Sequence, residues 1–276
     1  MSTGKFSISA DFLGSRDRQL FYILLSPAGG PTRPAVLYLP PFAEEMHMAR
    51  HVAAAQARAL AAAGHTVMLP DLSGCGDASG DFGDASWQHW LEDAGAAADF
   101  LKASGGGQLV LWGLRMGCLL AGALAAGRDD VARLLFWQPV LNGEQQIDQF
   151  LRVAVAASAL SGGGGFDRAV LWQALRDGQH LPVAGYALSP ELALPLGKER
   201  LANLSPACDV DWLEITPATG EELSPAAARV VERWCDAGVD VRTARHVGTP
   251  FWRSTDHAAQ VDTSLVERTM TLVEAW

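Results

Sequence analysis

Five residues between an apolar run and a small-residue helix have the spacing of a catalytic turn. Residues 109–112 are apolar, Gly113-Leu114-Arg115-Met116-Gly117 follows, and an Ala/Leu-rich stretch continues to residue 127. In the G-x-S-x-G pattern, the central serine of such a strand–turn–helix segment is a nucleophile. Here the central residue is Arg115, and a guanidinium that stays protonated at neutral pH cannot attack a carbonyl. The sequence therefore predicts that the ordinary acyl-enzyme step is absent.

The elements that must position this turn alternate between strands and helices. Alternating or near-continuous apolar runs predict strands at residues 5–12, 18–28, 34–41, 65–72, 105–114, 131–140, 209–218 and 239–247. Helical patterns fall at residues 44–63 and 86–103, after residue 115, and at 224–238 and 258–274. This alternation is typical of a mostly parallel, doubly wound α/β sheet, in which ligands bind at the carboxyl ends of the strands.

Residues 141–206 interrupt the alternation. They contain helical pieces separated by a run of glycines at residues 162–165. Long insertions between core strands usually have a function. We expect a helical cap at 141–206, inserted into one core domain formed by residues 1–140 and 207–276. An ordinary surface excursion is the alternative.

Composition limits the classes of function. The chain has 276 residues, of which 49% are hydrophobic, and a formal net charge of −10. It has no basic stripe, so we expect no nucleic-acid partner. Its four cysteines are far apart and no His/Cys spacing indicates zinc, so we expect no metal and no cofactor. Without a signal peptide or an apolar span in the sequence, a cytoplasmic location is the expectation.

Several phrases of the sequence carry a resemblance to a known family. The opening hairpin, the G-x-x-x-G turn after the fifth strand and the insertion after the sixth resemble the α/β-hydrolase superfamily. Within it, "YLPPFAEEMHMAR", "DLSGCGDASGDF", "LWGLRMG" and "FWQPVLNGEQQIDQFLR" resemble the exosortase A system-associated hydrolase 2 family, and "GYALSPELA" and "VGTPFW" extend the match. The resemblance implies a bacterial genome with a PEP-CTERM protein-sorting system. It does not define a substrate.

The superfamily resemblance gives positions for an acid and a base. The acid normally follows the strand at 209–218, where Glu221 and Glu222 stand; both could instead only begin the next helix, where carboxylates favour the dipole. The base normally follows the last strand, near His246 and His257, although a lone histidine there is more often solvated or a cap. Glu222 and His257 are the candidates for catalytic partners of position 115.

The same resemblance gives positions for an oxyanion hole. One backbone N–H belongs to the residue after the nucleophile, here Met116, and the other to the loop after the third strand, at Phe42 or Ala43. Because both donors are backbone groups, we expect them to be present even though the side chain at position 115 is not serine.

Arg115 needs a negative partner. It begins a helix, whose N-terminal N–H groups already favour anions, and its guanidinium adds a donor fork that fits carboxylate or phosphate. Glu44, Glu45 and Asp77 lie in loops that converge on the same sheet edge. We expect Glu44 or Glu45 to pair with Arg115 at roughly 2.7–3.0 Å; an open site for an anionic ligand is the alternative.

Thiols and aromatic residues supply further candidates. Cys75 lies in the Gly-rich loop after the fourth strand and Cys118 one helical turn beyond the elbow, but no clear base accompanies either, so we expect structural thiols. Gln138 and Trp252 follow the sixth and the last strands, where they could line a pocket or pack in the core.

Two functions stay open at this point. The first is an α/β-hydrolase that acts on an acyl or ester-like substrate with a rearranged site. The second is a catalytically silent member that binds a small anionic or acyl ligand, or a partner protein of the export system. The missing serine favours the second, and the retained turn and insertion favour the first. The sequence leaves the oligomeric state undetermined.

Overall fold

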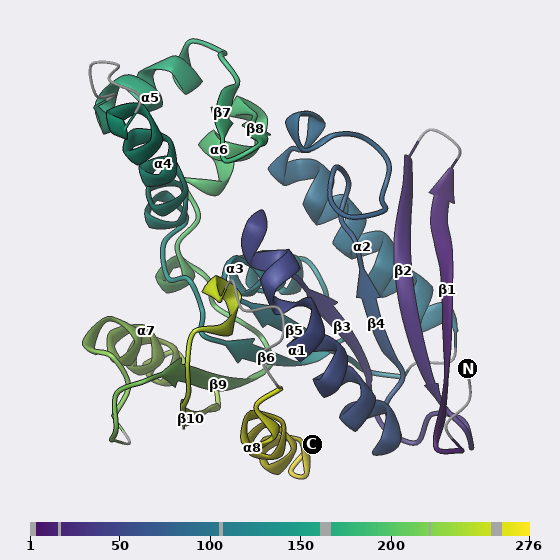
Figure 1. Cartoon of the computed structure of the whole chain (residues 1–276). Helices are drawn as coiled ribbons and strands as arrows, with labels where there is room; N and C mark the ends of the chain where they lie inside the picture. Colours follow the sequence, from purple (N-terminus) through teal and green to yellow (C-terminus); the bar gives the residue numbers. More distant parts are fainter. Residues whose placement is uncertain (1–3, 16–17, 105–106, 161–166, 221, 255–260) are drawn as a thin grey trace.

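The computed structural model describes the chain except residues 1–3, 16–17, 105–106, 161–166, 221 and 255–260 (Figure 1). It describes no side chains for residues 156–160. Two of the candidates from the sequence, Glu221 and His257, therefore lie outside the described residues.

One twisted sheet of eight strands forms the centre of the molecule. Its order is β1-β2-β4-β3-β5-β6-β9-β10. The β1–β2 and β2–β4 pairs are antiparallel, and the remaining pairs are parallel. The sheet is therefore mostly parallel, as the strand pattern predicts. The strands are β1(Phe6–Ser15), β2(Arg18–Pro27), β3(Ala35–Leu39), β4(Val67–Pro70), β5(Leu109–Leu114), β6(Val131–Trp137), β9(Asp209–Thr216) and β10(Val241–Val247).

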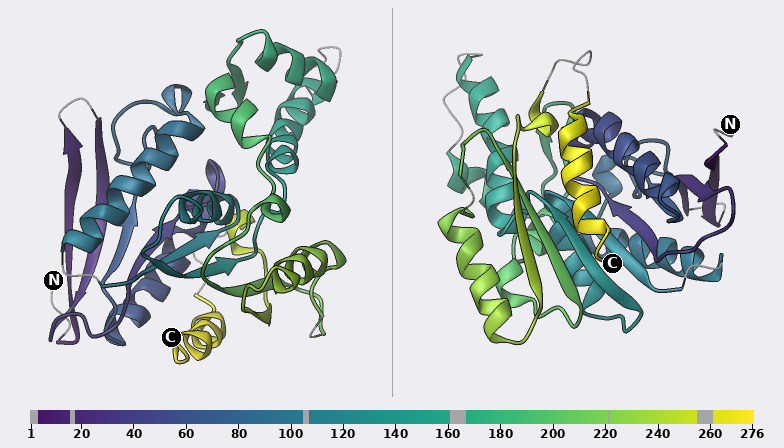
Figure 2. Two further views of the ribbon diagram at one scale, coloured as in Figure 1. Left: turned by 180° about the vertical axis from the view of Figure 1, so that it is seen from behind. Right: turned by 90° about the horizontal axis from the view of Figure 1, so that it is seen from below.

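Helices cover both faces of this sheet. Side chains that alternate along the strands separate two apolar clusters: Leu111 packs on the face of α2 and α3, whereas Val110 packs on the face of α1 and α8. The view from below shows helices on both sides of the strands (Figure 2). A strand covered on both faces needs a continuous apolar run, and every residue of β5 is buried. The helices are α1(Glu44–Ala62), α2(Trp87–Ala103), α3(Met116–Ala125), α7(Pro225–Asp236) and α8(Thr263–Val273).

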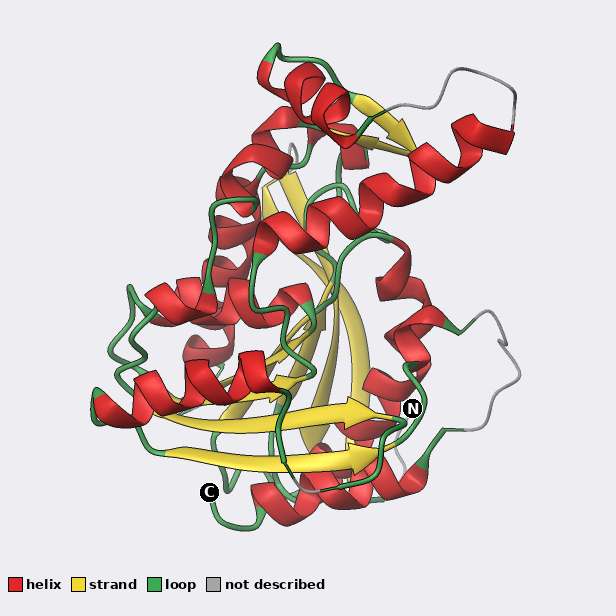
Figure 3. Ribbon diagram, turned by 90° about the vertical axis from the view of Figure 1, so that its left-hand side faces the viewer, coloured by secondary structure: helices red, strands yellow, loops and turns green. Residues whose placement is uncertain are grey.

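The segment between β6 and β9 stands above the carboxyl ends of the central strands (Figure 1). It holds α4(Gly143–Leu160), α5(Arg168–Arg176), β7(Leu181–Val183), β8(Tyr186–Leu188), α6(Pro190–Leu196) and the 3-10 helix η2(Leu201–Asn203). The strands β7 and β8 pair with each other and stay apart from the central sheet (Figure 3). The sequence pattern showed the helices of this segment but not its small hairpin.

The hairpin is fastened to the Gly-rich loop after β4. The Ser189 hydroxyl donates to the carbonyl of Ala85 at 2.6 Å, and the ring Nε2 of His180 lies 3.1 Å from the carbonyl oxygen of Gly83. Ser189 also caps α6, because its oxygen accepts from the N–H of Leu192. Side-chain bonds to backbone carbonyls thus connect the segment to the sheet domain.

No helix in the part of the chain that the structure describes is long and apolar enough to cross a lipid bilayer.

Candidate functional site at the turn between β5 and α3

Arg115 occupies a strained backbone turn. It joins β5 to α3 with φ of 56° and ψ of −117°, a conformation that is costly for any residue with a Cβ. Its N–H donates to the carbonyl of Trp137 at 3.0 Å. The neighbouring glycines permit the tight packing: a Cβ on Gly117 would lie 2.1 Å from the carbonyl oxygen of Leu39. A strained non-glycine residue at the carboxyl end of a central strand marks a functional candidate.

The Arg115 side chain is buried among polar groups. It is 8% exposed. Its Nε and Nη2 donate to Glu45 Oε1 at 3.4 and 3.3 Å, and Nη2 also faces the amide oxygens of Gln146 and Gln149 at 3.5 and 3.4 Å. One nitrogen is shared by three acceptors, so every contact is longer than the expected 2.7–3.0 Å of a direct ion pair. Glu45 is the carboxylate that meets Arg115.

Trp252 lies against the same guanidinium. It belongs to the 3-10 helix η3(Phe251–Arg253), which follows β10, and the Arg115 carbon Cζ is 5.3 Å from the centre of its ring. A cation over an indole face is attracted by the ring quadrupole. The indole is 4% exposed and therefore closes this side of Arg115 to water.

Glu45 is placed by the start of α1. It lies in the first helical turn, and its side chain is 8% exposed. Burial raises the pKa of this carboxyl, and the charge and hydrogen bond of Arg115 oppose that shift. The second oxygen, Oε2, is buried and meets no hydrogen-bond donor among the described residues, and the same is true of Glu44 Oε2. The pair with Arg115 thus leaves part of the carboxylate unsatisfied.

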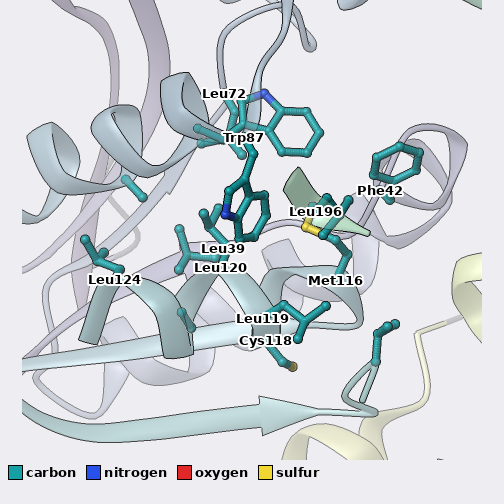
Figure 4. Packing of buried hydrophobic residues seen from close by; sticks show 14 of the residues in the cluster. Leu39, Phe42, Leu72, Trp87, Met116, Cys118, Leu119, Leu120, Leu124 and Leu196 are labelled. Atoms are coloured by element: carbon teal, nitrogen blue, oxygen red, sulfur yellow. The ribbon is translucent and has the colours of Figure 1, made fainter. Parts of the chain in front are cut away.

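The backbone donors that the sequence singled out remain near the turn. Ala43 precedes α1 with φ of 50° and ψ of −123°, nearly the conformation of Arg115, and Met116 is the first residue of α3. Among the described residues, no acceptor meets the N–H of Phe42 or of Met116. Phe42, Met116 and Leu196 of α6 belong to one cluster of buried apolar residues (Figure 4).

Of the expected acid and base residues, Glu222 and His246 are described and neither meets Arg115, whereas Glu221 and His257 lie outside the described residues. Glu222 is exposed. Glu214, near the end of β9, accepts from the hydroxyl and the N–H of Ser224 at 2.7 and 3.0 Å. His246 directs Nε2 to Asp262 Oδ2 at 2.7 Å, on the side of α8. None of these groups is placed to take a proton from residue 115.

The remaining candidates lie elsewhere. Gln138 has φ of 43°, and its amide oxygen accepts from the N–H of Ile215 at 2.6 Å, so it joins β6 to β9. Cys75 is half-buried, and burial raises the pKa of its thiol to about 12. Cys118 is fully buried and donates to the carbonyl of Gly113 at 3.2 Å. Neither thiol has the lowered pKa of a reactive cysteine.

A pocket of about 390 Å³ opens beside this cluster, between the start of α1, the helix α4 and η3. Gln149 links Arg115 to Arg253 at the edge of this pocket. Its amide oxygen accepts a hydrogen bond from Arg115 and another, at 3.2 Å, from Arg253 Nη2. The pocket is lined by Glu44, Glu45, Met48, Gln146, Gln149, Phe150, Arg152, Val153, Trp252 and Arg253.

The sequence reasoning missed Gln146, Gln149 and Arg253. The two glutamines are three residues apart and so share one face of α4. Phe150, beside Gln149, packs on Phe42 at a ring distance of 5.1 Å. In the sequence, the only sign of these glutamines was two polar residues at positions i and i+3 beside an aromatic residue. This pattern does not show which element the helix α4 will contact.

Comparisons with known proteins agree with this architecture. Residues 30–162 match the model of a family described as "Serine aminopeptidase, S33". No curated protein sequence matches the chain. Est1E from Butyrivibrio proteoclasticus, in a structure with bound ferulic acid, is 17% identical with a TM-score of 0.63, over 97% of this chain and 100% of that chain. The α/β hydrolase domain-containing protein 10 from mouse is 15% identical with a TM-score of 0.59, over 97% and 99%.

Proline iminopeptidase from Mycobacterium smegmatis is likewise 15% identical with a TM-score of 0.59, over 97% of this chain and 98% of that chain. The chain has the α/β-hydrolase fold. This confirms the fold class that the strand and helix pattern predicted. At these identities the likeness is one of fold. In this chain of α/β-hydrolase fold, the family match extends from before β3 to beyond the last residue of α4 and so includes the turn at Arg115.

Proposed function

We propose that this α/β-hydrolase-fold chain binds a small ligand in the pocket beside Arg115 and does not cleave esters through residue 115. One observation carries the proposal. At the turn where the fold would present a nucleophile, a guanidinium is buried, paired with Glu45 and covered by Trp252. Arg115 replaces the nucleophilic serine in this account, and the chain is the catalytically silent member that the sequence left as one of two alternatives.

The surroundings of Arg115 support binding rather than acyl transfer. Acyl transfer needs a base within hydrogen-bond reach of the nucleophile. An indole occupies the side of residue 115 that faces the loop after β10, and Glu45 is already engaged by the guanidinium. The N–H groups of Phe42 and Met116 meet no acceptor among the described residues, but both residues are buried and neither lines the pocket.

The segment 141–206 completes the pocket in this proposal. It acts as a cap on the core formed by residues 1–140 and 207–276. Support comes from α4, which brings Gln146 and Gln149 onto Arg115, and from the aromatic contact between Phe150 and Phe42. A ligand in the pocket would touch both parts of the chain.

A hydrolase of acyl or ester-like substrates is the second candidate. The match to the serine aminopeptidase family over residues 30–162 favours it. It would need a nucleophile elsewhere, such as Ser73 or Ser79 in the Gly-rich loop. The Ser73 hydroxyl oxygen accepts from Arg18 Nε at 3.3 Å, and that of Ser79 accepts from the N–H of Gln19 at 3.0 Å. Both serines therefore have structural partners.

The role in an exosortase and PEP-CTERM system stays a prediction that rests on sequence phrases between residues 37 and 152. The cytoplasmic location and an export-system partner protein stay predictions of the same kind.

Ester hydrolysis tests the proposal. We expect the protein and its Arg115→Met variant to hydrolyse p-nitrophenyl acetate and butyrate at the same background rate, because residue 115 takes no part in acyl transfer. A tenfold or larger loss of rate in Arg115→Met, with the fold intact by circular dichroism, would contradict it. Cys75→Ala serves as a control for a thiol-dependent background.

A further inference from the structure

We infer that the ligand of this pocket is amphoteric, with a cationic amine at one end and a carboxylate or similar anion at the other. The inference rests on the proposed binding function and names the chemical class of the ligand. It follows from two walls of opposite charge that line one cavity.

The acidic wall is formed by Glu44 and Glu45. Both line the pocket, and each has one buried carboxylate oxygen that no donor in the described part of the chain reaches. Glu45 is 6% exposed, and Arg115 uses only its Oε1. An unsatisfied buried carboxylate oxygen is unfavourable, so a ligand that brings N–H donors to this wall would satisfy it. A cationic ammonium supplies three such donors and a compensating charge.

The basic wall is formed by Arg152 and Arg253 at the exposed rim. Neither guanidinium has a carboxylate within ion-pair distance among the described residues, whereas nine of the other fifteen described arginines have one. The partner of Arg253 is the neutral amide oxygen of Gln149. A guanidinium presents a fork of donors that fits a carboxylate. The rim is therefore open to an anionic group of the ligand.

Apolar side chains also line the cavity. Met48, Phe150, Val153 and Trp252 complete the lining of the cavity of about 390 Å³. Pockets of this size hold small organic molecules. A ligand with only an anion would leave Glu44 and Glu45 unsatisfied, and a ligand with only a cation would face Arg152 and Arg253. An apolar spacer between an ammonium and a carboxylate fits all three parts.

Isothermal titration with matched compounds tests the inference. The amphoteric probes are 6-aminohexanoate, 4-aminobutyrate and phenylalanine; hexanoate and hexylamine carry one charge each. We expect at least one amphoteric probe to bind ten or more times as tightly as both single-charge compounds. In Glu44→Gln, the best amphoteric probe should bind no more tightly than hexanoate. In Arg253→Met, it should bind no more tightly than hexylamine. The matched controls, Glu232→Gln and Arg229→Met on the exposed face of α7, should change neither ratio.

Two results would overturn the inference. In one, hexanoate or hexylamine binds as tightly as the best amphoteric probe; the binding function would then stand and the ligand class would be wrong. In the other, no amphoteric probe binds at millimolar concentration. The hydrolysis assay on Arg115→Met is a separate measurement, so a catalytic protein would be recognised independently of either result.

Discussion

At the scale of single residues, the contact between Arg115 and Glu45 dominates the site. Both side chains are less than a tenth exposed. Removing two charges from water costs about as much as their attraction returns, so such a pair adds little net stability. Breaking it is different, because one charge then stays buried without its partner. We infer that the pair holds the pocket wall in position and contributes little to the stability of the fold.

Glu45→Gln is expected to lower the free energy of unfolding by about 2–4 kcal/mol, since it leaves Arg115 buried beside neutral amides only. Urea unfolding followed by circular dichroism measures the change. Glu44→Gln is the matched control on the preceding residue, and we expect less than about 1 kcal/mol there because Glu44 forms no ion pair among the described residues.

A double variant separates the charge effect from a packing effect. Arg115→Met together with Glu45→Gln removes both charges and should be more stable than Glu45→Gln alone. If the double variant is the less stable of the two, the interpretation of the pair as a buried charge and its partner is wrong.

At the scale of elements, the turn between β5 and α3 depends on the close approach of α3 to β3. Gly117→Ala would place a Cβ 2.1 Å from the carbonyl oxygen of Leu39, a backbone atom that cannot move aside alone. We expect a loss of about 3 kcal/mol or more, or failure to fold. Gly29→Ala, where a Cβ meets nothing within 4 Å, is the control and should be within about 0.5 kcal/mol of the parent in thermal or urea unfolding.

Asp130, the residue before β6, is paired with Lys102 of α2, and this ion pair predicts a loss of stability in acid. Hydrogen bonds from Arg128 and Lys102 hold the pKa of the Asp130 carboxyl well below its usual range, and the bond from Arg128 has the larger effect. A depressed folded-state pKa contributes stability above the unfolded value of about 4, and this contribution is lost as the pH falls below it. Between pH 4.5 and 2.5, Asp130→Asn should therefore lose less stability than the parent.

The melting temperature across this range measures the effect. Asp236→Asn, at the exposed end of α7, is the control and should follow the parent. An Asp130→Asn curve that runs parallel to the parent would contradict the role given to this ion-paired carboxylate.

The elements themselves were largely predictable from the sequence, because a strand covered on both faces requires an uninterrupted apolar run. Residues of β3 and β5 satisfy this requirement. The Gly-x-x-x-Gly spacing also placed Arg115 at a turn, since no residue with a Cβ fits at Gly117. The orientation of α4 was not predictable, because it depends on packing between Phe150 and Phe42, which are far apart in the chain. For the same reason Gln146 was missed. Gln138, which the sequence allowed either to line a pocket or to pack in the core, does not line the pocket beside Arg115, and its amide joins β6 to β9.

At the scale of the whole molecule, one apolar core joins the inserted segment to the sheet. Phe150 of α4 contacts Phe42, and Tyr186 of β8 lies 4.9 Å from Phe82 between ring centres. Buried residues of both parts belong to the same cluster. The two parts should therefore lose their structure together.

Hydrogen exchange tests this cooperation. We expect amides near the start of α4, around Ile147 and Leu151, to exchange with the same opening free energy as those of β5. Protection of α4 that is lower by more than about 2 kcal/mol would show that the segment opens independently of the sheet.

The most direct test of the central claim is the intact mass of the protein after incubation with an active-site fluorophosphonate. The account predicts no adduct, because Arg115 cannot form a phosphonyl ester and Trp252 cannot act as a base. A stoichiometric adduct on a single serine, such as Ser73 or Ser79, would contradict it and show a working nucleophile elsewhere in the fold.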